Sequence, residues 1–170
     1  NELCVSCGIC AGSCAPMGVG PTGRSGRDQL GNFNHWIQHQ DNIDKSILTI
    51  SCASLHAKVP TNSAHFTANC AGNIHTSVIE SALRHGYMGV MIAACHTRNC
   101  SNREGVKWLM ARIYEGREAD LRAQIDRSLI KVVLVEPYTN LNYDLAKFKS
   151  ALKTTEADKA KLSETNYECD

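Results

Sequence analysis

Three apolar segments of this chain each end in a cysteine, and helical patterns separate them. The cysteine-terminated segments are residues 46–52, 64–70 and 88–95, and a fourth apolar segment, residues 130–136, stops before Pro137. Helical periodicity fills residues 74–85, 103–116, 118–127 and 141–152. Strands that alternate with helices of roughly 10–15 residues predict crossover connections and a mostly parallel sheet. We therefore expect an α/β fold with a small open sheet of about four strands.

The cysteines at the strand ends predict a metal site. The carboxyl ends of parallel strands line one edge of a sheet, so the thiols of Cys52, Cys70 and Cys95 converge there, and Cys100 follows on the next loop. Four thiolates around a crevice suit a [2Fe–2S] cluster or a second cubane. Lone buried cysteines also occur simply as small hydrophobic residues. A redox disulfide or a catalytic thiol at Cys95 and Cys100 is the other functional alternative.

The first fourteen residues contain a second cysteine pattern. They read Cys4-x2-Cys7-x2-Cys10-x3-Cys14, followed by Ala15-Pro16, which is the bacterial ferredoxin run and predicts a [4Fe–4S] cluster. Structural zinc usually takes two separated cysteine pairs, and a disulfide framework needs no three-residue period. In two-cluster ferredoxins the fourth cysteine of this run ligates the other cluster. Either Cys14 completes its own cubane, or a cysteine outside these residues does.

Composition narrows the function classes. The 170 residues include 18 basic and 17 acidic side chains, so no global field attracts nucleic acid or an anionic membrane. The longest apolar run, residues 88–95, is far below the ~18 residues of a membrane span. Nine cysteines in a helix-rich chain favour metal ligation in a reducing compartment, and we expect the cytoplasm.

The pattern divides the chain into three parts. Residues 1–45 are expected to form a ferredoxin-like [4Fe–4S] segment, without periodic structure up to residue 31, and a polar linker with one short amphipathic turn. Residues 46–153 form the α/β domain with the second iron–sulfur site, and residues 154–170 are a charged tail. The charged stretch 112–127 is expected to be an exposed, salt-bridged face.

One block of sequence resembles a known family. Residues 86–96, GYMGVMIAACH, followed by Asn99-Cys100 and Arg103-Glu104-Gly105, are similar to the delta subunit of methyl-viologen-reducing hydrogenase. Residues 70–73, CAGN, are similar to that family's Cys-x-Gly-Arg segment. The domain also occurs fused to flavoproteins of the heterodisulfide reductase A type, often behind a cysteine run like that of residues 4–14. The resemblance implies a thioredoxin- or flavodoxin-like domain with a [2Fe–2S] cluster, which passes electrons between a flavin-containing subunit and a redox partner in a larger complex.

The chain departs from the family pattern at the expected cluster ligands. The family usually has a cysteine pair after its first strand, whereas here Cys52 stands alone, with Ser54 and Leu55 following. If Cys52 is not a ligand, His56 or His96 is the candidate substitute, as histidines replace cysteines in Rieske centres.

These observations predict an electron-transfer module of an oxidoreductase complex, with no substrate chemistry in this chain alone. The expected iron content is about six per chain, from one [4Fe–4S] and one [2Fe–2S] cluster. The alternatives are a thiol–disulfide or heterodisulfide enzyme that uses Cys95 and Cys100, and a structural zinc-binding interaction module.

Overall fold

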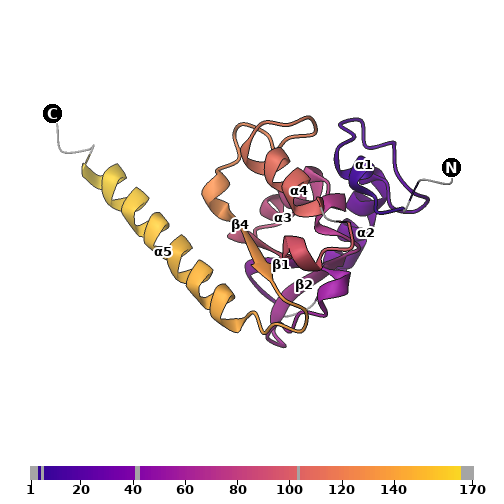
Figure 1. Cartoon of the computed structure of the whole chain (residues 1–170). Coiled ribbons are helices and arrows are strands. Elements are labelled where there is room, and N and C mark those ends of the chain that lie inside the picture. The colour runs from indigo at the N-terminus through magenta and orange to yellow at the C-terminus, as the bar shows by residue number, and fades with distance from the viewer. Residues whose placement is uncertain (1–3, 5, 41–42, 103, 166–170) are drawn as a thin grey trace.

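The chain folds around a four-stranded parallel sheet. The computed structural model describes residues 4, 6–40, 43–102 and 104–165 (Figure 1). The strands are β1 (Asp44–Cys52), β2 (Ser63–Ala68), β3 (Gly89–Cys95) and β4 (Ile130–Val135), in the order β2-β1-β3-β4. Every neighbouring pair is parallel, which confirms the predicted α/β class and open sheet.

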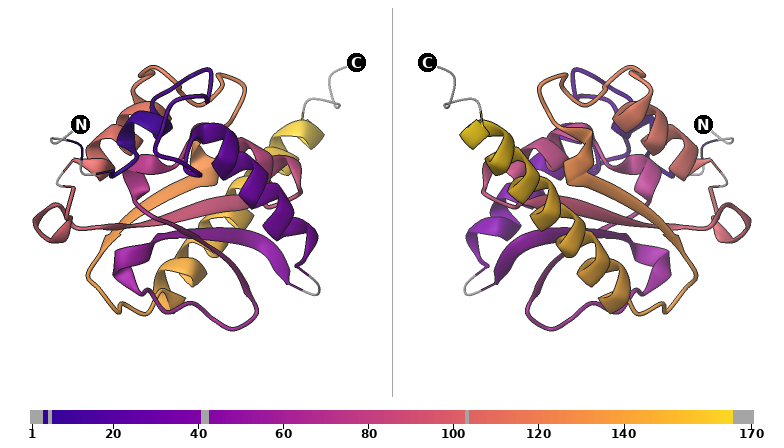
Figure 2. Two further views of the ribbon diagram at one scale, coloured as in Figure 1. Left: turned by 90° about the vertical axis from the view of Figure 1, so that its right-hand side faces the viewer. Right: turned by 90° about the vertical axis from the view of Figure 1, so that its left-hand side faces the viewer.

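Helices cover both faces of this sheet. They are α1 (Ile9–Gly12), α2 (Gly26–Gln38), α3 (Thr76–Arg84), α4 (Gly105–Tyr114) and α5 (Asn142–Thr165), with short 3₁₀ turns η1 (Ala53–Leu55), η2 (Ala71–Asn73), η3 (Thr97–Asn99) and η4 (Arg127–Leu129). Helices α2, α3 and α4 pack on one face, and α5 crosses the other (Figure 2). The result is a three-layer α/β/α arrangement.

The alternation of side chains along β1 and β3 divides the core between these layers. Leu48 and Ile50 of β1 join the cluster beneath α2, α3 and α4. Ile47 and Met91 point to the opposite face, where they meet Phe148 of α5. Every residue of β3 is buried, because strands lie on both of its sides and helices on both of its faces. This explains why β3 is a continuous apolar run in the sequence.

The strand order places a topological switch point between β1 and β3. From β1 the chain moves outward to β2, then crosses to the other side of β1 to form β3 and β4. Open α/β sheets bind ligands at the carboxyl ends of the two strands that flank such a point. Those ends are Cys52 and Cys95. The fold therefore puts two of the predicted ligands where a parallel sheet leaves a crevice.

The segment predicted as an irregular region and polar linker contains a full helix instead. Helix α2 has 13 residues and begins at a capping box, in which Ser25 and Asp28 each hydrogen-bond the other's backbone N–H. Phe33 and Ile37 are buried against the sheet, and Phe33 stacks edge-on against Phe66 of β2. The Ser25-x-x-Asp28 spacing was the sequence signal for this helix.

A second difference concerns residues 118–127, which the periodicity predicts as a helix. The structure has a loop there, with Gly116 and Ala119 in the left-handed region at φ 66° and 60°. The Arg127 guanidinium donates to the carbonyls of Leu121, Arg122 and Ile125, which a helix would have satisfied internally. Leu121 is fully buried, so the apolar spacing reflects its anchoring of a loop.

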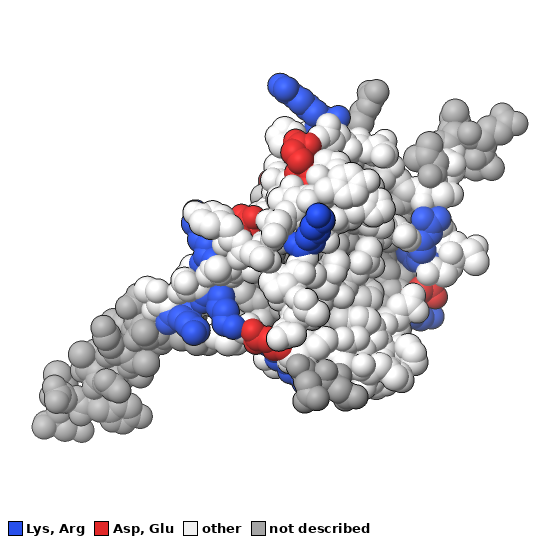
Figure 3. Space-filling model, turned by 90° about the horizontal axis from the view of Figure 1, so that it is seen from below, with Lys and Arg blue, Asp and Glu red and all other residues white. Residues whose placement is uncertain are grey.

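The described surface has mixed charge. On the face shown in Figure 3, basic and acidic side chains are interspersed with much uncharged surface, in keeping with the formal net charge of +1. No helix within the described ranges has the length and apolar character needed to cross a membrane. The backbone of α5 continues to Thr165, so the first part of the predicted tail is helical; residues 166–170 lie outside the described ranges.

Candidate metal centre at the carboxyl edge of the sheet

Four cysteines, which we call the strand-end thiols, meet at the carboxyl edge of the sheet: Cys52, Cys70, Cys95 and Cys100. Cys52 and Cys95 are the last residues of β1 and β3. Cys70 lies just beyond the end of β2 and caps η2, so it does not itself end a strand. Cys100 follows η3 and is half-buried, while the other three are only 4% exposed.

The Ser54 hydroxyl bridges two of these thiols. Its Oγ lies 3.1 Å from the Cys52 Sγ and 3.3 Å from the Cys95 Sγ. The Cys52 thiol also donates to the carbonyl of Asn69, with a 3.6 Å separation between sulfur and oxygen. Ser54 is therefore a polar neighbour of the site that no metal-ligand pattern in the sequence identified.

The strand-end thiols also interact electrostatically. The pKa of the Cys95 thiol is raised to about 11, mainly by burial; the Ser54 hydrogen bond opposes this rise, and the neighbouring Cys52 and Cys100 add to it. Burial likewise raises the pKa of Cys70, while the Asn102 side chain and the Gly72 N–H lower it by hydrogen bonding to its sulfur. Burial thus favours the protonated form of the Cys70 and Cys95 sulfurs. A metal group would supply the charge that makes four thiolates stable there.

Two glycines leave the space in which Cys70 sits. A Cβ on Gly105, the first residue of α4, would lie 2.8 Å from the Cys70 Sγ. A Cβ on Gly72 would lie 2.5 Å from the Gly105 Cα. Both distances are shorter than packing allows, so only glycine permits η2 and α4 to approach this closely beside the sulfur.

The N-terminal cysteine segment, residues 4–14, is more open. Cys4 and Cys10 are exposed, and Cys7 and Cys14 are half-buried. Gly8 caps α1 in the left-handed conformation at φ 80°, and its carbonyl accepts from the Ala11 N–H. Gly8 thus turns the chain into α1 within the cysteine run.

The residues after Cys70 hold the N-terminal cysteine segment against the α/β domain. The Asn73 amide donates to the Gly8 carbonyl at 2.8 Å, and the His75 Nε2 donates to the Cys14 carbonyl at 3.2 Å. His75 accepts the Ser77 N–H at its other ring nitrogen, and burial lowers its pKa, so it is neutral. The two cysteine regions are thus neighbours through one turn, η2.

Metal ligation itself remains a prediction. Among the side chains that the structure describes, no three of Cys, His, Asp and Glu are arranged to hold a metal ion. The strand-end thiols nevertheless fit an iron–sulfur group in their donor type, their burial and the glycine space beside Cys70. The candidate substitutes His56 and His96 are both exposed, and the His56 ring stacks on Tyr138.

Sequence reasoning placed Arg112 wrongly. It lies within the stretch predicted as an exposed charged face, but its side chain is fully buried. Its position three residues after the buried Leu109 was the available signal, because helical residues three apart lie on the same face of the helix. Arg122 does fit the prediction, since it is exposed and pairs with Glu80 at 3.2 Å.

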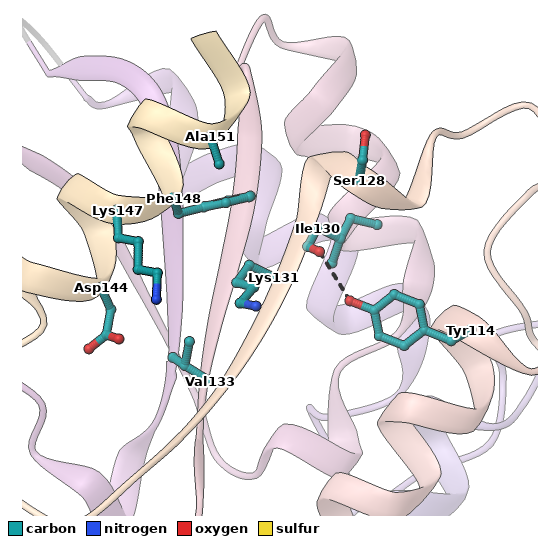
Figure 4. Close-up of a pocket in the computed structure, with 9 residues that line it drawn as sticks. All are labelled: Tyr114, Ser128, Ile130, Lys131, Val133, Asp144, Lys147, Phe148 and Ala151. Atoms are coloured by element: carbon teal, nitrogen blue, oxygen red, sulfur yellow. Dashed lines mark hydrogen bonds between the residues drawn. The ribbon is translucent and has the colours of Figure 1, made fainter. Parts of the chain in front are cut away.

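A separate hollow of about 420 Å³ lies between β4 and α5 (Figure 4). Lys131, Lys147 and Phe148 line it, and Tyr114 beyond β4 donates from its hydroxyl to the Ile130 carbonyl at 3.0 Å. None of its lining residues is a cysteine, so it is not part of the candidate metal centre.

Comparison with known proteins gives the family. No curated protein matches the chain. The family model described as "Methyl-viologen-reducing hydrogenase, delta subunit" matches residues 48–154, which is more than half of the 170 residues and contains all four strand-end thiols. The chain therefore belongs to the methyl-viologen-reducing hydrogenase delta subunit family.

Proposed function

We propose that this chain is an iron–sulfur electron-transfer subunit. It relays electrons between a flavin-containing, heterodisulfide reductase-like subunit and a redox partner in a larger oxidoreductase complex. The proposal joins the family membership, whose name describes a hydrogenase subunit, to the two cysteine patterns. Bound iron–sulfur groups would supply reversible one-electron chemistry at the two sites.

The observation that carries the proposal is the gathering of the strand-end thiols at the switch point of the sheet. Cys52, Cys70 and Cys95 would ligate from beneath the surface, and half-buried Cys100 would close the site on its outer side. The Gly72 N–H and the Asn102 side chain already point at the Cys70 sulfur. Such hydrogen bonds to sulfur raise the reduction potential of an anionic cluster and hold its ligands in place.

The thiol–disulfide alternative fits these residues less well. A catalytic thiol needs a pKa near or below neutrality, because the thiolate is the nucleophile. Burial instead raises the pKa of Cys95 to about 11. A buried thiol with this pKa is suited to ligation, where the metal displaces the proton, and not to attack on a disulfide.

The test is metal and sulfide analysis of the anaerobically purified protein, with EPR of the reduced state. We expect about six irons and about six sulfides per chain, and two distinct EPR signals. Cys95→Ser should remove the signal of the strand-end site and leave the other. Zinc in place of iron would refute the proposal and favour the structural zinc module.

Cys169→Ser is the matched control, because Cys169 belongs to neither cysteine pattern. It makes the same chemical change as Cys95→Ser and should leave both EPR signals at wild-type intensity. Loss of iron in this control would show that a cysteine outside the two patterns is a ligand.

A further inference from the structure

Arg112 is a buried cation between the two cysteine regions. Its side chain is fully buried in the last turn of α4. One guanidinium nitrogen, Nη1, donates to the Ser13 Oγ at 3.0 Å. The other, Nη2, donates to the carbonyls of Gly72 and Ile74 at 2.9 and 3.2 Å. The guanidinium therefore binds the N-terminal cysteine segment and the turn after Cys70 at the same time.

No carboxylate of the described residues is paired with this cation. No ion pair joins Arg112 to an acidic residue within the described ranges, and its Nε has no hydrogen-bond acceptor there. Its pKa is lowered to about 10, mainly by burial and partly by the nearby Arg117, while Cys70 acts in the opposite direction. A buried charge is unfavourable unless opposite charge or full hydrogen bonding compensates it. Three hydrogen bonds compensate part of the Arg112 charge, and an anionic group nearby would compensate the rest.

Gly12 allows the N-terminal cysteine segment to pack directly against the Arg112 guanidinium. A Cβ on Gly12 would lie 2.8 Å from the Arg112 Nη2 and 2.6 Å from the Gly72 carbonyl oxygen. The N-terminal cysteine segment thus reaches the guanidinium only because Gly12 has no side chain. Gly12 lies two residues before Cys14, and Gly72 lies two residues after Cys70, so each contact is close to a predicted ligand.

We propose that Arg112 is a positioning residue that joins the two cysteine sites and whose buried positive charge stabilises the anionic groups they hold. This inference rests on the proposed function for its electrostatic part. Its mechanical part, the docking of residues 6–14 on η2, concerns only this chain and is tested without metal. Each electron that enters a thiolate-ligated cluster adds negative charge, and a nearby cation in a low-dielectric environment favours that reduced state.

Three variants separate charge from geometry. Arg112→Gln removes the charge, and Arg112→Lys keeps the charge but loses the planar fork that contacts Ser13 and Gly72 together. Arg117→Gln is the matched control, because it removes an exposed arginine close to Arg112 whose guanidinium lies over the Trp108 ring instead of binding the cysteine regions within the described residues. Solvent and salt screen an exposed charge far more than a buried one.

The first readout is the reduction potential of each cluster, from EPR-monitored redox titration of the purified protein. We expect Arg112→Gln to shift the reduction equilibrium of the strand-end site toward the oxidised form by about tenfold, which is about 59 mV for one electron. Arg112→Lys and Arg117→Gln should each shift it by less than about twofold. An Arg112→Gln potential equal to that of wild type would overturn the electrostatic part.

The second readout is backbone hydrogen exchange of residues 6–14 in the iron-free protein. We expect faster exchange in Arg112→Lys and Arg112→Gln and unchanged exchange in Arg117→Gln, since only the first two lose the forked contact. Should Arg112→Gln fail to fold, Ser13→Ala tests the same contact between Arg112 and the N-terminal cysteine segment, because it removes the Ser13 hydroxyl acceptor and keeps the guanidinium. Wild-type exchange in both Ser13→Ala and Arg112→Lys would overturn the docking role. Wild-type protein without iron would refute the proposed function and leave this exchange test valid.

Discussion

Gly105→Ala is the sharpest test of how the strand-end site is built. The added Cβ would lie 2.8 Å from the Cys70 Sγ, 3.3 Å from the Gly72 N and 3.5 Å from the Gly72 Cα. The contact with the Cys70 sulfur is the severe one of the three, and because Cys70 is buried its short side chain has little room to turn away. Overpacking of this kind costs about 1–3 kcal/mol. Either η2 moves away from α4, or the Cys70 sulfur leaves its position.

Gly31→Ala provides a control of opposite sign. Gly31 lies inside α2, and a Cβ there would meet no atom within 4 Å. Replacing an unconstrained helical glycine by alanine stabilises a helix by about 0.5–1 kcal/mol. The same chemical change is therefore expected to stabilise the chain at Gly31 and to destabilise it at Gly105. The gap between the two variants should be about 1.5–4 kcal/mol.

Urea unfolding under anaerobic conditions measures this difference in unfolding free energy between the two variants, and EPR shows which iron–sulfur site the substitution affects. With a denaturant slope of about 2 kcal/mol per molar, a loss of about 2 kcal/mol lowers the unfolding midpoint by about 1 M. Gly105→Ala should also weaken the EPR signal of the strand-end site. If Gly105→Ala unfolds at the wild-type urea concentration with full iron content, the close packing of Gly105 on Cys70 does not constrain the site.

Three further predictions address α5, pH and thiol reactivity. Phe148→Ala should lose about 3–5 kcal/mol of unfolding free energy, because the Phe148 ring is 7% exposed and packs on the sheet. An unchanged urea midpoint in this variant would mean that α5 is not docked on the sheet. Lys149 holds the pKa of Asp44 at about 2, so their exposed pair contributes to folding stability above pH 3.8, and this contribution is lost as the pH falls through about 2. Lys149→Met should raise the Asp44 pKa, measured by NMR titration, and cost under about 1 kcal/mol of unfolding free energy at neutral pH. An unchanged Asp44 pKa in this variant would exclude the pair. In the iron-free protein, iodoacetamide should label Cys95 far more slowly than exposed Cys10 at pH 7, and the labelling rate of Cys95 should rise toward pH 11. Equal labelling of the two cysteines at pH 7 would contradict the burial of Cys95.

The sheet was predictable because its strands carry their own signals. Strands β1, β3 and β4 end within two residues of their predicted ends, where cysteine or proline follows an apolar run. Strand β2 is weaker, because it is an edge strand and is only partly buried. Its end at Ala68 lets Cys70 turn into η2 instead of extending the ladder. The periodicity prediction failed at residues 118–127, because the fully buried Leu121 anchors a loop there and not one face of a helix.

The strand-end thiols were predictable from topology alone, whereas the residues that connect them to the N-terminal segment were not. Parallel strands bring Cys52 and Cys95 together wherever the intervening chain runs. The contacts of Asn73 and Arg112 depend on how two segments dock, with 65 and 99 residues separating donor and acceptor. The helical position of Arg112 indicates that its side chain faces the core, but no local pattern shows which segments its guanidinium binds.

The turn η2 makes the two cysteine regions one mechanical unit. The Gly72 N–H is directed at the Cys70 sulfur, and its carbonyl accepts from Arg112, which also binds Ser13. Asn73, the next residue, donates to the Gly8 carbonyl at the start of α1. A displacement of this turn therefore changes both the surroundings of Cys70 and the docking of the N-terminal segment. Groups that share a backbone shift are energetically coupled, so the unfolding free energies of Gly105→Ala and Asn73→Ala should be non-additive by more than about 0.5 kcal/mol.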